Sequence, residues 1–237
     1  MGVRIGTYNI RGMHDDVPAL VRVIQAMDCD VLCVQEAPKF LWWRSKRHEL
    51  ADLTGMRIAA GRRLAGLAVY VRPGVKVLHE ETHVLKIFFP REIRGLALAV
   101  VEVEGVRLAV GSIHLALVPA QRLHHANQIM SLVEAAAARF SAIPVVCGDL
   151  NETDHQPTWR YFAGRLSDCY PAAPRGDGRT FTARNPSSRI DAVFAGPGLR
   201  IDWCGGAEAA PADLVSATDH LPVIASLTPA PAPADTP

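Results

Sequence analysis

The stretch Cys147–Asp154, CGDLNETD, follows a run of apolar residues with acids and an amide. A turn is one explanation, because Gly, Asp and Asn leave a strand readily and hydrogen-bond their own backbone. The alternative is that Asp149 and Asn151 belong to a site to which other strands also contribute. The two explanations are distinguished by whether other apolar runs end in the same kind of residue.

Short apolar runs enriched in Val and Ile recur along the chain, and we expect them to form strands. These runs are residues 4–10, 30–36, 66–72, 96–103, 107–117, 143–151, 189–196 and 220–227. Several are apolar nearly throughout, which is typical of strands buried on both faces. Residues 102–107, EVEGVR, indicate a hairpin turn between neighbouring strands.

Helices are predicted between several of these strands by apolar periodicity and by their end signals. They cover residues 16–27, 45–55 and 119–140. Pro119 suits the first turn of a helix, and Gly55 suits the end of one. Because strands and helices mix without strict alternation, we expect an α/β (α+β) protein built from layered sheets rather than a barrel.

The composition is that of a soluble globular protein, with 49% hydrophobic and 21% charged residues among 237. No apolar run approaches the roughly 20 residues that cross a bilayer, so we expect no integral membrane association. The start of the chain shows no signal peptide, so we predict a cytoplasmic protein. Five cysteines without metal-ligand spacing indicate buried, reduced thiols. Nothing in the sequence indicates a protein partner.

The chain shows no internal linker, and we predict one catalytic domain over residues 1–228. Residues 229–237 are rich in Pro and Ala and are predicted to form a disordered tail. A formal net charge of +1 neither requires nor excludes nucleic acid as a substrate. Any such affinity has to come from a local basic surface, because it depends on the number of phosphates that the protein neutralises.

Polar residues with the chemistry of a metal site interrupt or end the apolar runs. They are Asn9, Glu36, His114, Asp149, Asn151, Asp191, Asp219 and His220. A buried carboxylate costs several kcal/mol unless it is paired, hydrogen-bonded or bound to a metal, so this recurrence points to one shared site. The oxygen-rich set without thiolates favours Mg²⁺ or Mn²⁺ over structural zinc.

The order and spacing of these motifs resemble the endonuclease/exonuclease/phosphatase superfamily, which has the DNase I-like fold. The matching motifs are TYNI, VQE, SIHL, GDLN, SRIDAVF and TDHLPV. The resemblance covers nearly the whole chain and implies a four-layer sandwich, with two mixed β-sheets packed face to face and helices outside. It also places the active site at one end of the sandwich, so Asp149 and Asn151 are expected to be active-site residues.

The resemblance assigns a role to each matching residue. Glu36 resembles the principal metal carboxylate, with Asn9 beside it and Asp219 near the metal. Asp191 resembles the acid that orients His220.

The same resemblance implies that Asp149 positions or deprotonates the attacking water, while Asn151 and His114 hold phosphate oxygens. Either Asp149 or His220 takes the proton. Arg94 occupies a position where relatives often carry an arginine, and it is either a phosphate contact or a solvated strand-start residue.

These residues predict a divalent-metal-dependent phosphoesterase, and a sequence-tolerant nuclease is the first hypothesis. The alternative substrate is a lipid or small-molecule phosphoester, since the site residues do not distinguish the two. A catalytically silent binding module on the same fold is a third hypothesis, but it predicts a broken metal or dyad position. The aromatic and basic segment 40–49 either binds nucleic acid or packs as loop and helix, and packing is favoured.

Overall fold

The structure is a computed structural model that describes residues 2–90 and 92–230. The first of its two sheets contains β1 (Val3–Asn9), β2 (Val31–Gln35), β3 (Arg57–Ala60), β4 (Ala68–Val71), β10 (Pro174–Arg175), β12 (Leu199–Gly205) and β13 (Val223–Pro229). These seven strands lie in the order β10-β12-β13-β1-β2-β4-β3. The sheet is mixed, because β1 pairs in parallel with β2 and antiparallel with β13.

The second sheet has six strands in the order β5-β6-β7-β8-β11-β9. They are β5 (Lys76–Val84), β6 (Gly95–Val103), β7 (Val106–His114), β8 (Ile143–Asp149), β9 (Ser167–Asp168) and β11 (Asp191–Ala195). This sheet is also mixed, since β7 and β8 are parallel while β8 and β11 are antiparallel. The predicted hairpin at residues 102–107 is confirmed, because Val103 pairs with Val106.

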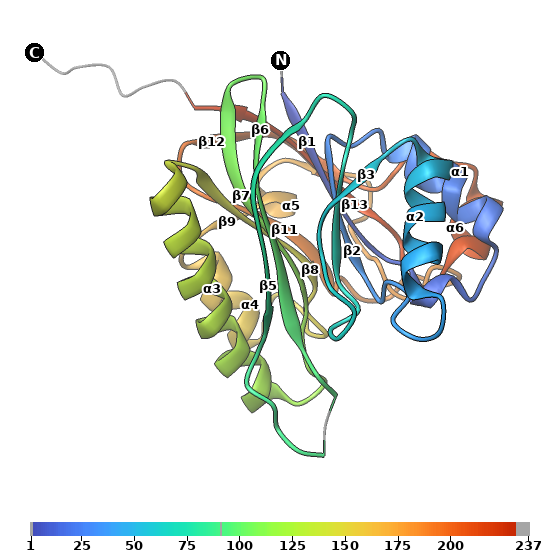
Figure 1. The fold of residues 1–237 in the computed structure, drawn as a ribbon, viewed down its shortest axis with the longest axis horizontal. Coiled ribbons are helices and arrows are strands. Elements are labelled where there is room, and N and C mark those ends of the chain that lie inside the picture. The colour runs from blue at the N-terminus through green and yellow to red at the C-terminus, as the bar shows by residue number, and fades with distance from the viewer. Residues whose placement is uncertain (1, 91, 231–237) are drawn as a thin grey trace, which may run out of the picture.

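Helices cover the outer face of each sheet (Figure 1). On the first sheet lie α1 (Val17–Met27), α2 (Trp43–Thr54) and α6 (Pro211–Ala217). On the second lie α3 (Pro119–Phe140) and α4 (Pro157–Ala163). The short α5 (Cys169–Ala172) places Cys169 in the core between the sheets, and the 3-10 turn η1 (Arg11–Met13) follows β1. The predicted four-layer sandwich is therefore confirmed.

The core between the sheets is built largely from valine and alanine, and strand alternation explains how. Val31 and Cys33 of β2 face the second sheet, whereas Leu32 and Val34 face the helices. Both faces of β2 are thus buried, which accounts for its continuous apolar sequence. All five cysteines are buried and free, as predicted.

All of the predicted strands and helices are present, but several elements were missed. The longest of these is β5, whose polar sequence KVLHEETHV lacks a continuous apolar run and lies at the edge of the second sheet. Strand β12 and helices α4, α5 and α6 were also missed. The predicted tail lies mostly outside the described residues, and the division into domain and tail stays a prediction. Strand β13 continues to Pro229.

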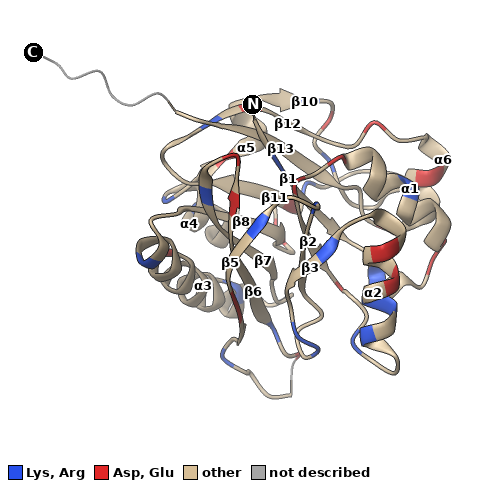
Figure 2. Cartoon of the chain, turned by 45° about the horizontal axis from the view of Figure 1, so that its top comes forward, with Lys and Arg blue, Asp and Glu red and all other residues tan. Residues whose placement is uncertain are grey.

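Charged residues of both signs are spread over the molecule, and both occur along α2 (Figure 2). This distribution agrees with the formal net charge of +1. No helix within the described residues is long and apolar enough to span a membrane.

A buried ion pair joins α3 to the loop that follows β8. The Arg122 Nε donates to Glu152 over 2.7 Å, and the two side chains are 3% and 0% exposed. Arg122 also donates to the carbonyls of Ala116 and Leu117, while Glu152 accepts from the backbone N–H of Trp159. The pair therefore fixes the loop that carries the GDLN motif against two helices, α3 and α4.

Glu152→Ala should lower the free energy of unfolding by roughly 3–5 kcal/mol, because it leaves the Arg122 guanidinium buried without a counter-charge. Urea denaturation followed by circular dichroism measures this loss. The control Glu102→Ala breaks a more exposed ion pair with Arg107 and should change the unfolding free energy far less. Similar losses for the two variants would contradict the prediction.

Candidate active site

Strand register gathers three of the predicted residues at one end of the second sheet. His114 ends β7 and Asp149 ends β8, and the two are partners in the parallel pairing. Strand β11 runs antiparallel to β8, so its first residue, Asp191, is the partner of Asp149 on the other side. Asp149 thus lies between a histidine and an aspartate on neighbouring strands.

The first sheet brings two more residues to the same end of the sandwich. Asn9 ends β1 and is paired with Gln35, the last residue of β2. Glu36 follows immediately and has a left-handed backbone conformation, with a φ of 49°. Its carbonyl accepts from the backbone N–H of Gly12 over 2.8 Å. The turn after β2 is therefore held against the turn after β1.

The Asn9 amide bridges the two sheets. Its Nδ2 lies 3.1 Å from Glu36 Oε1, 3.1 Å from Asp149 Oδ2 and 3.4 Å from His220 Nε2. Its Oδ1 accepts from the backbone N–H of Arg11 over 3.1 Å. The side chain is 1% exposed, and the carboxylates of Glu36 and Asp149 accept its two Nδ2 hydrogens. In this orientation the nitrogen of Asn9 faces the carboxylates.

Asp149 is held by donors on several sides. Its Oδ1 accepts from the backbone N–H of Asn151 over 2.9 Å, and its Oδ2 lies 3.4 Å from His114 Nε2. Burial raises the pKa of Asp149, although the nearby His114 opposes this shift. Burial also lowers the pKa of His114 to about 3, which keeps that imidazole neutral near pH 7. Asp149 is therefore a better proton acceptor than an exposed aspartate.

Asp191 and His220 form the predicted pair. His220 Nδ1 lies 2.9 Å from Asp191 Oδ2, and both side chains are buried. Burial tends to lower the pKa of His220, but the charge and hydrogen bond of Asp191, helped by Asp149 and Asp219, raise it to about 9. The imidazole is thus held protonated, with Nε2 directed at Asp149 over 3.8 Å.

Asp219 lies at the half-exposed rim of the cluster. Its neighbour Thr218 donates from Oγ1 to the backbone carbonyl of Asn9 over 3.1 Å, which ties the loop before β13 to the end of β1. The Nε of Arg11 lies 3.7 Å from Asp219 Oδ2. Asp219 is therefore beside the bridge at Asn9 while remaining open to solvent.

Asn151 and Arg94 complete the predicted set. Asn151 donates from Nδ2 to the carbonyl of Leu115 over 2.9 Å, which fixes its side chain next to the end of β7. Arg94 is 8% exposed and pairs with Glu92 over 2.7 Å. Burial lowers the pKa of Arg94, and the charges of Glu92, Asp149 and Glu36 oppose this shift. Arg94 is consequently a buried cation near the cluster rather than a solvated strand-start residue.

The donor set suits a divalent cation. Glu36, Asp149, Asp191 and Asp219 concentrate negative charge at one end of the sandwich, an arrangement that a hard cation stabilises. The ligand atoms of Asp149, Asp191 and His220 lie within 4.8 Å of one another, but this buried group could bind a cation only after the His220 imidazolium lost a proton. The predicted metal ligands are Asn9, Glu36 and Asp219. They lie next to this buried group, because the Asn9 amide donates to both Glu36 and Asp149. Which of these residues bind the metal stays a prediction.

Two residues that were not predicted from the sequence, Phe181 and Thr180, support the Asp191–His220 pair. The ring of Phe181 packs on the His220 imidazole with centroids 4.9 Å apart. The Oγ1 of Thr180 accepts from the backbone N–H of Asp191 over 3.3 Å, and the Thr180 carbonyl accepts from Leu221 over 2.7 Å. Both belong to a segment without regular periodicity, so no pattern distinguishes them from loop residues.

The two packed sheets with helices on their outer faces define a protein of the DNase I-like class. A sequence profile of the Endonuclease/Exonuclease/phosphatase family matches residues 6–220. The chain belongs to this family. A comparison with curated proteins found no significant match.

Solved structures with the same fold include an endonuclease/exonuclease/phosphatase from Bacteroides vulgatus, with 20% identity, a TM-score of 0.81 and coverage of 97% of this chain and 100% of that one. The Bacteroides thetaiotaomicron mannosyl-6-phosphatase Bt3783 is 16% identical, with a TM-score of 0.81 and coverage of 95% and 99%. The catalytic domain of human Nocturnin, with a bound sulfate anion, is 14% identical, with a TM-score of 0.75 and coverage of 97% and 95%. At these identities the likeness establishes the fold.

In metal-free protein kept in chelator, the His220 imidazole should titrate with a midpoint near pH 9, which NMR can follow. Because this pKa lies above the ordinary value of 6.5, the contact with Asp191 stabilises the fold fully below pH 6.5. That contribution is lost as the pH rises through about 9.

Asp191→Asn should move the His220 midpoint down, whereas the control Asp52→Asn on α2 should leave it in place. A wild-type midpoint at or below 6.5 would contradict the charge assignment.

Proposed function

We propose that the protein hydrolyses phosphodiester bonds with the help of Mg²⁺ or Mn²⁺, and that its first candidate substrate is a nucleic acid cleaved without sequence preference. The observation that carries this proposal is the bridge of Asn9 to Glu36 and Asp149, which brings the metal carboxylate and the base candidate together. Membership of the Endonuclease/Exonuclease/phosphatase family supports the hydrolysis of a phosphoester bond.

Glu36 and Asp219 would hold the cation, with Asn9 beside them. When bound, it supplies Lewis-acid chemistry that offsets charge on the phosphoryl oxygens. Both carboxylates are half-exposed, which leaves them open to a solvated ion.

The cytoplasmic location stays a prediction.

The chain's own residues would divide the remaining work. Asp149, with its raised pKa, accepts the proton of the attacking water. His220, held as an imidazolium by Asp191, stabilises the charge that develops on the phosphoryl group. This division favours Asp149 over His220 as the general base.

Substrate oxygens have three further donors in this proposal. They are the neutral His114, which lies 3.4 Å from Asp149, the side-chain amide of Asn151, whose backbone N–H donates to Asp149, and the buried guanidinium of Arg94, on which the charge of Asp149 acts. Such fixed donors stabilise charge without reorganising during the reaction.

A small-molecule or lipid phosphoester is the second candidate substrate. It is favoured by a pocket of about 310 Å³ beside Glu36, a size that suits a small ligand. The fold is also shared with a mannosyl-6-phosphatase. A catalytically silent binding module is disfavoured. That hypothesis predicts a missing metal ligand or a broken Asp191–His220 pair, and all of these residues are present in the cluster.

A substrate panel tests the proposal. Purified protein with Mg²⁺ or Mn²⁺ is assayed on plasmid DNA, RNA, a chromogenic phosphodiester, a monoester and sphingomyelin. Cleavage of DNA or RNA without sequence preference supports the first candidate. Hydrolysis of a lipid or small phosphoester without nuclease activity supports the second, and no hydrolysis of any substrate refutes the proposed function.

Chelation should abolish activity and added Mg²⁺ or Mn²⁺ should restore it. Glu36→Ala should remain folded but bind Mn²⁺ more weakly in a calorimetric titration, because it removes a carboxylate from the cluster. Glu49→Ala on α2 serves as the control and should bind the ion as wild type does. Full activity of Glu36→Ala in excess chelator would rule out the metal mechanism.

Asp191→Ala and His220→Ala should each lower kcat by roughly 10²–10³-fold, the range for loss of one group that stabilises developing charge. Because the two residues share one role, the double variant should be little worse than either single variant. Steady-state kinetics on the preferred panel substrate measure all three. Losses that multiply in the double variant would show that the residues act separately.

A further inference from the structure

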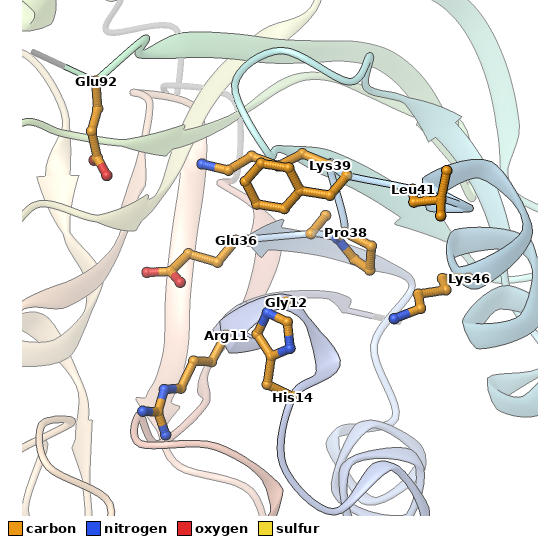
Figure 3. A pocket seen from close by; sticks show the side chains of 11 residues that line it. Arg11, Gly12, His14, Glu36, Pro38, Lys39, Leu41, Lys46 and Glu92 are labelled. Carbon is orange, nitrogen blue, oxygen red and sulfur yellow. The ribbon is translucent and has the colours of Figure 1, made fainter.

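A pocket with charged and apolar walls opens beside the catalytic cluster. Its volume is about 310 Å³, and Glu36 forms part of its wall (Figure 3). Pro38 and the side chains of Phe40 and Leu41, which are 74% and 79% exposed, add apolar surface. A substrate bound at Glu36 therefore has room to extend along this wall.

Two lysines, Lys39 and Lys46, line this pocket. Among the described residues neither forms an ion pair, and the Lys39 ammonium lies over the Phe40 ring, 5.8 Å from its centroid. Two other charged residues of the pocket are already paired, since Arg11 pairs with Asp15 and Glu92 pairs with Arg94. Lys46 is thus a cation of this pocket that is available to a ligand.

The two lysines lie at different ends of the pocket. In Figure 3 the Lys39 ammonium reaches toward the side where Glu36 lies, whereas Lys46 reaches in toward His14. The Lys39 charge also contributes to lowering the pKa of His114, after burial and other neighbours, which agrees with a position near the cluster. Lys46 and His14 therefore mark the end of the pocket that lies away from the catalytic residues.

The exposed side chain of His14 lies beside Gly12 at the wall of the pocket. Gly12 has a φ of 69°, and a Cβ there would lie 2.6 Å from His14 Nε2.

We infer that this pocket receives the part of the substrate beyond the reacting phosphate, and that this part carries a second phosphate bound by Lys46 and His14. The inference rests on the proposed function and narrows its substrate to a phosphoester with two phosphate groups. The Lys46 ammonium and the His14 imidazole offer the kind of donors that a phosphate dianion requires. Polynucleotides and small bisphosphates share this chemistry.

Neighbouring basic residues of α2 do not take part. The Arg47 guanidinium is buried and donates to the carbonyl of Pro38 over 2.9 Å, which confirms packing for that residue. Arg44 lies over the ring of Trp43 and does not line the pocket. Arg44 is therefore a matched control for a charge on the same helix.

The test compares binding of adenosine 3′,5′-bisphosphate and adenosine 5′-monophosphate by calorimetry in Mg²⁺, with the probes checked for integrity by chromatography. Wild type should bind the bisphosphate more tightly. Lys46→Gln should weaken bisphosphate binding by roughly tenfold, the value of one charged hydrogen-bond partner, and leave monophosphate binding nearly unchanged. Lys46→Arg should restore most of the affinity, and Arg44→Gln should match wild type.

Equal affinity of wild type for the two probes, or an equal loss in Arg44→Gln and Lys46→Gln, would overturn the subsite. Steady-state kinetics on a short oligonucleotide and on a hexose bisphosphate then distinguish a polynucleotide substrate from a small bisphosphate. Lys46→Gln should raise KM more for the substrate class that the pocket binds. A protein that binds the bisphosphate through Lys46 but hydrolyses no phosphoester would refute the proposed function and leave the subsite standing.

Discussion

The geometry of the candidate active site depends on the buried amide of Asn9, which holds two carboxylates from different sheets. Asn9 donates to both Glu36 and Asp149, so the sheets cannot shift relative to each other without breaking a buried hydrogen bond. Leaving such a polar group without a partner costs about 1–3 kcal/mol, more when the group is charged. The bridge therefore links the packing of the sandwich to the spacing of its catalytic groups.

Strand pairing explains why like charges can be held so close. Asp149 is registered between His114 and Asp191, so an imidazole lies on one side of it and the partner of His220 on the other. Each carboxylate of this row has a nitrogen nearby, which offsets part of the repulsion. A cation at the half-exposed carboxylates would offset more of it.

The sequence predicts the strands and the residues at their ends, because an apolar run that stops at an acid is visible locally. It does not predict which distant group compensates that acid. Glu152 lies in the stretch CGDLNETD, residues 147–154. Its partner Arg122 lies on a helix 30 residues earlier, and only the fold brings the two side chains together. Phe181 and Thr180 were missed for the same reason, and the edge strand β5 because its sequence is polar.

The proposed catalytic residues and the proposed phosphate subsite lie on different parts of this chain. The candidate catalytic residues His114, Asp149 and Asp191 stand at strand ends, where strand pairing fixes them. The pocket beside Glu36 is formed instead by the turn after β1, the segment 37–41 and the first turns of α2, which are free of the sheet register. Loops of this kind can change without disturbing the core. The identity of the substrate therefore has to be sought in Lys39, Lys46 and their neighbours rather than in the strand-end residues.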